Sequence, residues 1–326
     1  MHTLSDLLTR SPFTQGGVLG QGLPGLYAPP ALKWIAVRQR FEQFHRNLSL
    51  TELQQQDAYT KVAGVVGCLN RCYYRTTSAT DNAFAIGSWG KGTAIRPPRD
   101  IDLYFLLPVN DYNRFQVYTL NRQSALLQEV KEVLADTYWD TDIRGDGQVV
   151  VVRFGSYSVE VAPAFLLTNG RYFICNTRDG GSYKETDPWA EARHIEAVDQ
   201  ACSRNLRPLI RMLKAWQAYC SVPIKSFQIE LLAADFLSNS HWRNWDFFWF
   251  DWITRDFFAF LYYRANTFVI VPGTFEFIFL GNEWQSKTAS AYWRAEKACK
   301  YEEHNQVAAA GEEWQKIFGT DIPKMA

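Results

Sequence analysis

The most informative segment of this chain reads Gly87-Ser-Trp-Gly-Lys-Gly-Thr-Ala-Ile-Arg-Pro-Pro-Arg-Asp-Ile-Asp102. An apolar run, Leu-Tyr-Phe-Leu-Leu, follows directly, so the end of the segment is typical of a β-strand that begins at Asp100. Side chains at positions i and i+2 of a strand point to the same face, so Asp100 and Asp102 should project together while Ile101 faces the core. Two carboxylates this close repel each other, and a divalent cation removes that penalty. The segment therefore predicts a metal-binding position on a strand.

The residues ahead of this strand are typical of a phosphate-binding loop. Gly87 lets the backbone approach a phosphate without a side chain in the way, and Ser88 adds a hydroxyl. Loop N–H groups can form an anion-binding concavity, to which Thr93 would add a second hydroxyl. For Lys91 two interpretations stay open, a solvated loop position, which is preferred, and a contact with phosphate.

A third carboxylate is expected at Glu160. This residue lies in the strand-like run Ser158-Val-Glu-Val-Ala162, where the flanking Val159 and Val161 should point into the core. Hard oxygen ligands favour magnesium or manganese, which commonly retain waters and bind substrate phosphates. Asp100, Asp102 and Glu160 are therefore the predicted catalytic residues and the ligands of two Mg²⁺ or Mn²⁺ ions.

Outward from these segments, the pattern predicts a mixed α/β half. Residues 1–30 are rich in Gly and Pro and indicate an irregular lead-in, with a short helix starting near Ala31. A longer helix is expected up to about Arg75, opened by a capping box at Ser49-Leu-Thr-Glu52. A further helix is expected over residues 114–137. Residues 149–154 and 158–162 then predict an antiparallel hairpin.

The second half is expected to be mainly helical. Helices are predicted over 204–219 and 227–238, with one or two more within 284–318. The aromatic segment 241–264 is interpreted as core packing in preference to a base-stacking surface. We therefore expect an α+β protein with a central cleft. Its predicted parts are a lead-in with a short helix (1–48), a catalytic core (49–200) and a helical domain that completes the pocket (201–326).

Composition limits the classes of function. Of the 326 residues, 47% are hydrophobic and 15% aromatic, as in a packed globular protein. The formal net charge is zero, which gives no support for a large polyanionic partner. The sequence has no apolar run long enough for a membrane span or a secretory signal, and its six cysteines lack zinc-ligand spacing. A cytoplasmic location without membrane contact is expected.

The motifs also resemble those of a known family. Gly-Ser, eleven residues and Asp-x-Asp is the signature of the polymerase-β-like nucleotidyltransferase superfamily. The wider pattern resembles the bacterial cGAS/DncV-like nucleotidyltransferases (CD-NTases) over roughly residues 50–322. Further segments that carry the resemblance are Val159-Glu-Val-Ala-Pro-Ala-Phe165, Thr186-Asp-Pro188, Leu206-Arg-Pro-Leu-Ile-Arg-Met-Leu-Lys-Ala-Trp216, Ser226-Phe-Gln-Ile-Glu-Leu-Leu232 and Trp314-Gln-Lys-Ile-Phe-Gly319.

The resemblance implies a polymerase-β-like core, with a mixed twisted sheet and a long N-terminal helix, joined to a C-terminal helical bundle. It implies that Lys214 and Ser226 contact the triphosphate of a bound nucleotide. For Ser226 the alternative is helix N-capping by its hydroxyl. Asp187 either lies near the acceptor pocket or caps a turn before Pro188. The nucleotide-binding candidates are thus Gly87, Ser88, Thr93, Asp187, Lys214 and Ser226.

The implied function is synthesis of a cyclic di- or trinucleotide second messenger for bacterial antiphage (CBASS-type) signalling. Its substrates would be ribonucleoside triphosphates, ATP and possibly GTP, UTP or CTP. The resemblance also leaves room for a protein regulator or a conjugating partner at the C-terminal tail. Activation by double-stranded DNA is not expected, because the zinc-binding insertion of animal cyclic GMP–AMP synthase is absent. The segment Val271-Pro-Gly273 departs from the family pattern and leaves base identity open. The alternatives are a linear oligonucleotide synthase, an RNA-directed nucleotidyltransferase and a non-catalytic nucleotide-binding protein.

Overall fold

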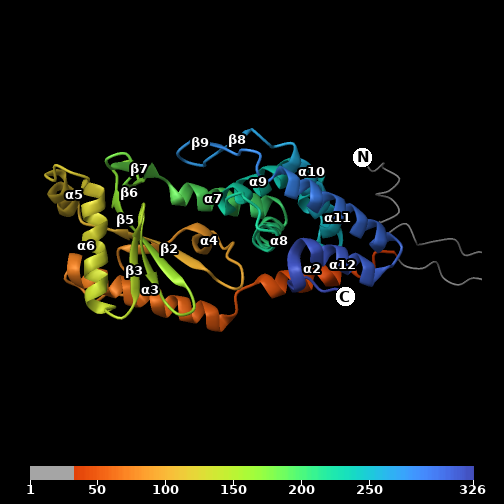
Figure 1. Cartoon of the computed structure of the whole chain (residues 1–326), viewed down its shortest axis with the longest axis horizontal. Coiled ribbons are helices and arrows are strands. Elements are labelled where there is room, and N and C mark those ends of the chain that lie inside the picture. Colours follow the sequence, from red (N-terminus) through yellow and green to blue (C-terminus); the bar gives the residue numbers. More distant parts are fainter. Residues whose placement is uncertain (1–32) are drawn as a thin grey trace, which may run out of the picture.

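The computed structural model describes residues 33–326, which fold into two lobes along one axis. A β-sheet with its covering helices lies at one end, and a helical bundle lies at the other (Figure 1). The predicted lead-in, and the expected helix start at Ala31, fall largely outside the described residues. The first described helix, α2, begins at Val37.

The sheet of the first lobe has seven strands. Its main path runs β1-β2-β5-β4-β3, and β6 and β7 extend it from the far half of β5. Strands β2 and β5 pair in parallel, while the remaining pairs are antiparallel. The strands are β1 (Ala83–Ala85), β2 (Asp100–Leu106), β3 (Asp142–Asp146), β4 (Val149–Arg153), β5 (Ser158–Leu166), β6 (Tyr172–Asn176) and β7 (Ser182–Thr186).

One face of this sheet packs on α3 and α6, as Figure 1 shows. The predicted antiparallel hairpin is present as β4 and β5, but β5 passes through Pro163 to Leu166, further than expected. Proline cannot donate a ladder hydrogen bond. Pro163 is accommodated because it lies in a gap between two pairings. Strand β4 pairs with β5 only as far as Val161, and β6 pairs with β5 only from Ala164 onward. Strands β6 and β7 were not predicted. The helices of this lobe are α3 (Glu52–Tyr73), α4 (Gly87–Gly90), α5 (Val109–Gln116) and α6 (Arg122–Thr137).

Two local predictions in this lobe are wrong. The capping box lies at Thr51, whose hydroxyl accepts the N–H of Gln54 while the Gln54 side chain accepts the N–H of Thr51. Ser49 instead ends α2, and its hydroxyl donates to the carbonyl of His45. The helix expected over 114–137 is two helices, because the side chain of Asn121 caps a new start at α6.

The second lobe is a helical bundle with its own apolar core. Helix α2 packs into this core through Phe41 and Phe44, so the N-terminal helix lies with the C-terminal ones (Figure 1). The aromatic segment is buried at Trp242, Phe250 and Phe257, which confirms core packing. The elements are α2 (Val37–Leu48), α7 (Pro188–Ala201), α8 (Leu206–Tyr219), α9 (Ser226–Asn239), η1 (His241–Asn244), η2 (Phe247–Trp249), α10 (Phe250–Tyr262), α11 (Gln285–Glu303), α12 (Val307–Phe318) and η3 (Gly319–Asp321).

A small hairpin, β8 (Phe268–Ile270) and β9 (Phe277–Phe279), extends from the helical lobe toward the sheet (Figure 1). Its turn contacts the first lobe, where Arg171 donates to the carbonyl of Gly273 at 2.7 Å and Lys184 pairs with Glu276 at 2.8 Å. None of the helices between residues 33 and 326 combines the length and apolar character that a bilayer crossing needs.

Candidate active site

Three carboxylates come together on adjacent strands of the sheet. In the parallel ladder Asp102 lies opposite Glu160, and Asp100 lies opposite Ser158. Neighbouring strands are about 4.8 Å apart, and opposed side chains share a face. Ile101 and Val159 point to the other face and are buried in the core. The alternation of apolar and acidic residues thus directs all three carboxylates away from the core.

Burial and neighbouring carboxylates raise the pKa of two residues in this cluster, Glu160 and Asp102. Burial, followed by the charges of Asp102 and Asp100, raises the pKa of Glu160 to about 7. Burial and the charge of Asp100 also raise the pKa of Asp102, against the opposing effect of Lys91. The cluster is therefore short of positive charge on its own side of the site.

The donor set fits a hard divalent cation. Among residues 33–326, no group of three or more His, Cys, Asp or Glu side chains forms a cage that could hold a metal ion by itself. Magnesium needs no such cage, since it keeps several waters and binds through one or two carboxylates together with substrate phosphates. The three side chains offer only oxygen ligands, and burial and neighbouring negative charge raise the pKa of Asp102 and Glu160, so a bound divalent cation would be favourable there.

Gly87 makes room for one of these carboxylates. Its φ is +56°, and a Cβ added there would lie 2.0 Å from Oδ2 of Asp102. The N–H of Ile86 also donates to the carbonyl of Asp102 at 2.9 Å. From the sequence, Gly87 is expected to permit close approach of a phosphate. The structure shows a further requirement for glycine at this position, because any side chain would displace the carboxylate of Asp102.

A cavity of about 260 Å³ opens in front of Asp100 and Asp102. Most of the predicted nucleotide-binding residues line it, whereas Glu160 and Asp187 are not among its lining residues. The two lobes contribute facing walls. The first lobe supplies Gly87, Ser88, Thr93, Asp100 and Asp102, and the helical lobe supplies Lys214, Gln217, Ser226, Phe227 and Glu230.

The opposite wall is built around a glutamate that the sequence analysis missed. Glu230 is 2% exposed, and its carboxylate lies 2.6 Å from both Lys214 and Lys91. It also accepts the hydroxyl proton of Thr93 at 2.5 Å. Although burial opposes it, the two lysines hold the pKa of Glu230 below its usual value. In the sequence, Glu230 is marked only by its place in the run that begins at Ser226. Its partners are distant in the sequence, so only the structure identifies them.

Two expectations about side chains are revised by these contacts. Lys91 is not solvated, because it is 5% exposed and also lies 3.5 Å from Glu191. Lys214 lines the cavity as expected, but its ammonium also donates to the carbonyl and the hydroxyl of Thr93 at 3.2 and 3.0 Å.

Ser226 and Asp187 have different local roles. Ser226 is the first residue of α9 and faces the cavity, and its hydroxyl donates to the side chain of Gln217 at 2.8 Å. Its hydroxyl makes no helix-capping bond, since Lys225 holds the N-cap position. Asp187 caps α7 by accepting the N–H of Ala190 at 2.8 Å.

The family model for the Second Messenger Oligonucleotide or Dinucleotide Synthetase domain (SMODS) matches residues 35–199. The chain belongs to this family. The match runs from α2 through nearly all of α7 and so includes the three carboxylates and the loop beside them. A probable cyclic nucleotide synthase of Bacillus cereus (strain VD146) is 22% identical over 273 residues, which cover 73% of this chain and 81% of that protein.

Solved structures share the fold of this SMODS-family chain. CdnC of E. coli MS115-1, in complex with HORMA-deltaN, is 18% identical with a TM-score of 0.63, covering 87% of this chain and 98% of that one. The Vibrio cholerae DncV cyclic AMP-GMP synthase, solved with a linear intermediate, is 13% identical with a TM-score of 0.61, covering 89% and 87%. The Elizabethkingia meningoseptica CdnE cyclic dinucleotide synthase, with GTP and Apcpp, is 16% identical with a TM-score of 0.57, covering 78% and 98%.

The family and the α+β nucleotidyltransferase fold predicted from the motifs are thereby confirmed. Membership identifies the chain as a nucleotidyltransferase of the second-messenger synthetase kind.

Proposed function

We propose that this SMODS-family nucleotidyltransferase joins ribonucleoside triphosphates into a cyclic di- or trinucleotide and releases pyrophosphate at each transfer. Asp100, Asp102 and Glu160 would hold two Mg²⁺ or Mn²⁺ ions. The observation that carries the proposal is the pairing of Asp102 with Glu160 across β2 and β5, beside a cavity whose facing wall carries Lys214.

In each transfer, a ribose hydroxyl oxygen of the acceptor nucleotide would attack the α-phosphorus of the donor. The new P–O bond forms as the bond to the bridging oxygen breaks, pyrophosphate leaves and the hydroxyl proton passes to solvent. Bound divalent ions would lower the proton affinity of that hydroxyl and neutralise charge on the leaving group. The residues of the chain contribute mainly by positioning the two nucleotides.

The facing wall would hold the donor triphosphate. Lys214 offers an ammonium, a compact charge suited to phosphate, and Ser226 offers a hydroxyl beside it. Gly87, Ser88 and Thr93 lie on the loop across the cavity, where Ser88 and the backbone would approach the phosphates. Asp187 is left out of this assignment, because its carboxylate caps α7 and does not line the cavity.

The biological setting is part of the proposal. A cyclic nucleotide made by a bacterial enzyme of this family would act in the cytoplasm and activate a separate effector in antiphage (CBASS-type) defence. The related CdnC was solved with a HORMA protein, which supports the proposal that a protein partner regulates this chain also.

The decisive experiment offers the protein all four labelled ribonucleoside triphosphates with Mg²⁺ or Mn²⁺. Pyrophosphate release is measured, the mixture is treated with phosphatase, and the surviving products are identified by mass spectrometry. A cyclic product survives phosphatase, whereas a linear product loses its terminal phosphates. The Asp102→Asn variant serves as the matched inactive control. Absence of pyrophosphate from every mixture would refute the proposed function.

A further inference from the structure

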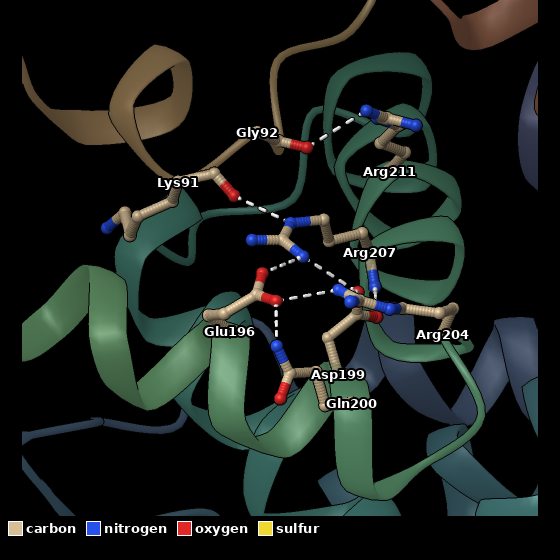
Figure 2. A network of polar contacts seen from close by, with 8 residues as sticks. All are labelled: Lys91, Gly92, Glu196, Asp199, Gln200, Arg204, Arg207 and Arg211. Carbon is tan, nitrogen blue, oxygen red and sulfur yellow. Dashed lines mark hydrogen bonds and ion pairs between the residues drawn. The ribbon is translucent and has the colours of Figure 1, made fainter.

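Three cationic side chains of α8 bind three successive carbonyls of the loop beside the carboxylates. Arg207 donates to the carbonyl of Lys91 at 2.9 Å, and Arg211 donates to that of Gly92 at 2.9 Å (Figure 2). Lys214 donates to the carbonyl of the next loop residue, Thr93, at 3.2 Å. Residues spaced three and four apart lie on one face of a helix. We call this set, Arg207, Arg211 and Lys214, the α8 clamp.

The same loop residues are also held through their side chains. Lys91 and Thr93 both bind the carboxylate of Glu230 on α9, at 2.6 and 2.5 Å. Gly92 has φ of +67°, and a Cβ added there would lie 3.2 Å from Nε of Arg207. Residues 91–93 are therefore fixed to the helical lobe by backbone and side chains together.

Arg207 is oriented by carboxylates of α7. Its guanidinium lies 2.7 Å from both Asp199 and Glu196, and it spans the distance from these residues to the loop (Figure 2). Arg204 shares both carboxylates, at 2.8 Å from Glu196 and 3.5 Å from Asp199, but Figure 2 shows no contact between Arg204 and the loop. The chain thus offers two arginines with the same acidic partners, of which one contacts the loop.

Arg211 has no such partner. Within the described part of the chain, no carboxylate lies within ion-pair distance of it, and its hydrogen bond to Gly92 is directed at the loop. Burial holds the pKa of Arg211 below its usual value, with a smaller contribution from Arg207. Arg211 is half-buried, and partial burial of a cation whose hydrogen bond goes only to a backbone carbonyl adds little to folding stability. Stability alone therefore does not account for Arg211 at this position.

The other end of the loop adjoins the carboxylates. The N–H of Thr93 donates to the carbonyl of Ser88 at 2.8 Å, and that of Lys91 donates to the carbonyl of Gly87 at 3.1 Å. Gly87 in turn touches the carboxylate of Asp102. A shift of residues 91–93 would thus be passed on to Ser88 and to Asp102.

We propose that Arg207 and Arg211 are positioning residues for nucleotidyl transfer, which fix α4 and the loop after it (residues 87–93) between the helical lobe and Asp102. The inference rests on the proposed function, since transfer is the reaction positioned. Within the α8 clamp, Lys214 alone lines the cavity. It can exchange the carbonyl of Thr93 for a phosphate oxygen while the two arginines keep the loop in place.

The test compares Arg211→Met, Arg211→Lys and the control Arg204→Met in the full chain. Without nucleotide, amide hydrogen exchange of residues 91–93 should become about tenfold faster in Arg211→Met, because the loop opens more often. With ATP and Mg²⁺, kcat should fall by about 10- to 100-fold, the scale of a small misplacement at a reacting centre, while KM stays within about threefold. Arg211→Lys should recover part of both effects, and Arg204→Met should show neither.

A second variant guards against loss of the fold. Arg207→Lys keeps a positive charge opposite Asp199. A single ammonium, however, cannot bind that carboxylate and the carbonyl of Lys91 at the same time, as the planar guanidinium of Arg207 does. It should show the same pattern of faster exchange and lower kcat at an unchanged Tm. Unchanged exchange in both variants, or a fall in kcat that only follows a fall in Tm, would overturn the inference. If the wild-type chain releases no pyrophosphate, the proposed function fails, and the exchange measurements still decide whether the arginines hold the loop.

Discussion

The two walls of the cavity differ in whether their carboxylates are paired with cations of the chain. On the sheet, Asp100, Asp102 and Glu160 lie on adjacent strands, and burial together with the neighbouring negative charges raises the pKa of Asp102 and of Glu160. On the helical side, Glu230 lies between two lysines at 2.6 Å each, so its charge is compensated within the fold. Removing a charge should therefore destabilise the helical wall, whereas the sheet wall should tolerate it or gain stability. The Glu230 cluster thus balances its own charge within the fold, whereas the carboxylates of the sheet would need a bound cation to balance theirs.

The largest effect is expected at Glu230. Glu230→Ala would leave Lys91 and Lys214 buried without their shared counter-charge, and breaking a buried ion pair from one side costs about 3–5 kcal/mol of folding free energy. Urea unfolding at neutral pH measures the loss. The matched control is Glu312→Ala, because Glu312 forms its pair with Lys324 on the surface. Equal effects of the two variants would show that the buried cluster is not a stabilising unit.

Next in size are Asp100→Asn and Asp102→Asn. Each should lower turnover by at least about 10²-fold, the scale of removing one principal electrostatic stabiliser. Pyrophosphate release at saturating ATP and Mg²⁺ checks this, with Asp142→Asn, an exposed partner of Arg144, as the control. Neither catalytic variant should be less stable than the wild type in the absence of metal, in contrast to Glu230→Ala. Near-normal turnover in either would remove that residue from the proposed site.

Added Mg²⁺ or Mn²⁺ should relieve the repulsion on the sheet. An ion that binds only the folded chain stabilises it by about 2.7 kcal/mol at a hundredfold excess over its Kd. Thermal unfolding across a metal titration measures this gain. The gain should disappear in Asp102→Asn and persist in Asp142→Asn. A gain of the same size in Asp102→Asn would place the ion elsewhere.

A smaller effect is expected from the titration of Glu160. Burial and the neighbouring carboxylates raise the pKa of Glu160 to about 7 in the folded chain, whereas a glutamate in the unfolded chain has its ordinary pKa of 4.5. The folded state thus binds more protons between these values, so the contribution of Glu160 to stability falls as pH rises through this window. Without metal, Glu160→Gln should be the more stable protein at pH 8 and lose that advantage below pH 4.5. Thermal unfolding at several pH values checks this, and a difference that does not change with pH would contradict it.

The smallest effect is expected at Ser226. Its hydroxyl bonds Gln217 at the cavity wall, and a single neutral hydrogen bond contributes about 0.5–1.5 kcal/mol. Ser226→Ala should raise KM for ATP severalfold with little change in kcat, whereas Ser226→Thr should restore KM in part. A fall in kcat with unchanged KM would assign Ser226 to the reacting centre instead.

Features of the site that depend on local sequence could be predicted, whereas those that depend on contacts between distant residues could not. The alternation Asp-Ile-Asp and Val-Glu-Val identified the face of each strand that carries carboxylates, because the period of a strand is local. Nothing local identified the partners of Glu230, since they come from α8 and the loop after α4. The solvated interpretation of Lys91 failed for the same reason. A polar residue in a loop looks exposed until the fold supplies a buried counter-charge.

Boundaries were less predictable than the elements themselves. Ser49 with Glu52 fits the capping-box pattern, but Thr51 with Gln54 fits it equally well two residues later. The structure favours Thr51, because Ser49 is still occupied in ending α2. Pro163 indicated the end of a strand, but β5 continues through it. The N–H that proline lacks would lie at a position of β5 that neither β4 nor β6 pairs with. Strand β6 is the mostly apolar run Tyr-Phe-Ile-Cys-Asn, and β7 is the mostly polar run Ser-Tyr-Lys-Glu-Thr, so neither shows the alternation that marks a strand.

The parallel register of β2 and β5 has a consequence for insertions and deletions. Adding one residue within β5 ahead of Glu160 would turn that carboxylate toward α3 and bring a valine to the reactive face, since a one-residue slip inverts every side chain. The part of the connection that runs through α5 and α6 carries no strand register, whereas β3 and β4, which follow it, are paired residue by residue with each other and with β5. Tolerance to length change should therefore drop abruptly at Asp142, where β3 begins the ladder that continues through β4 to β5.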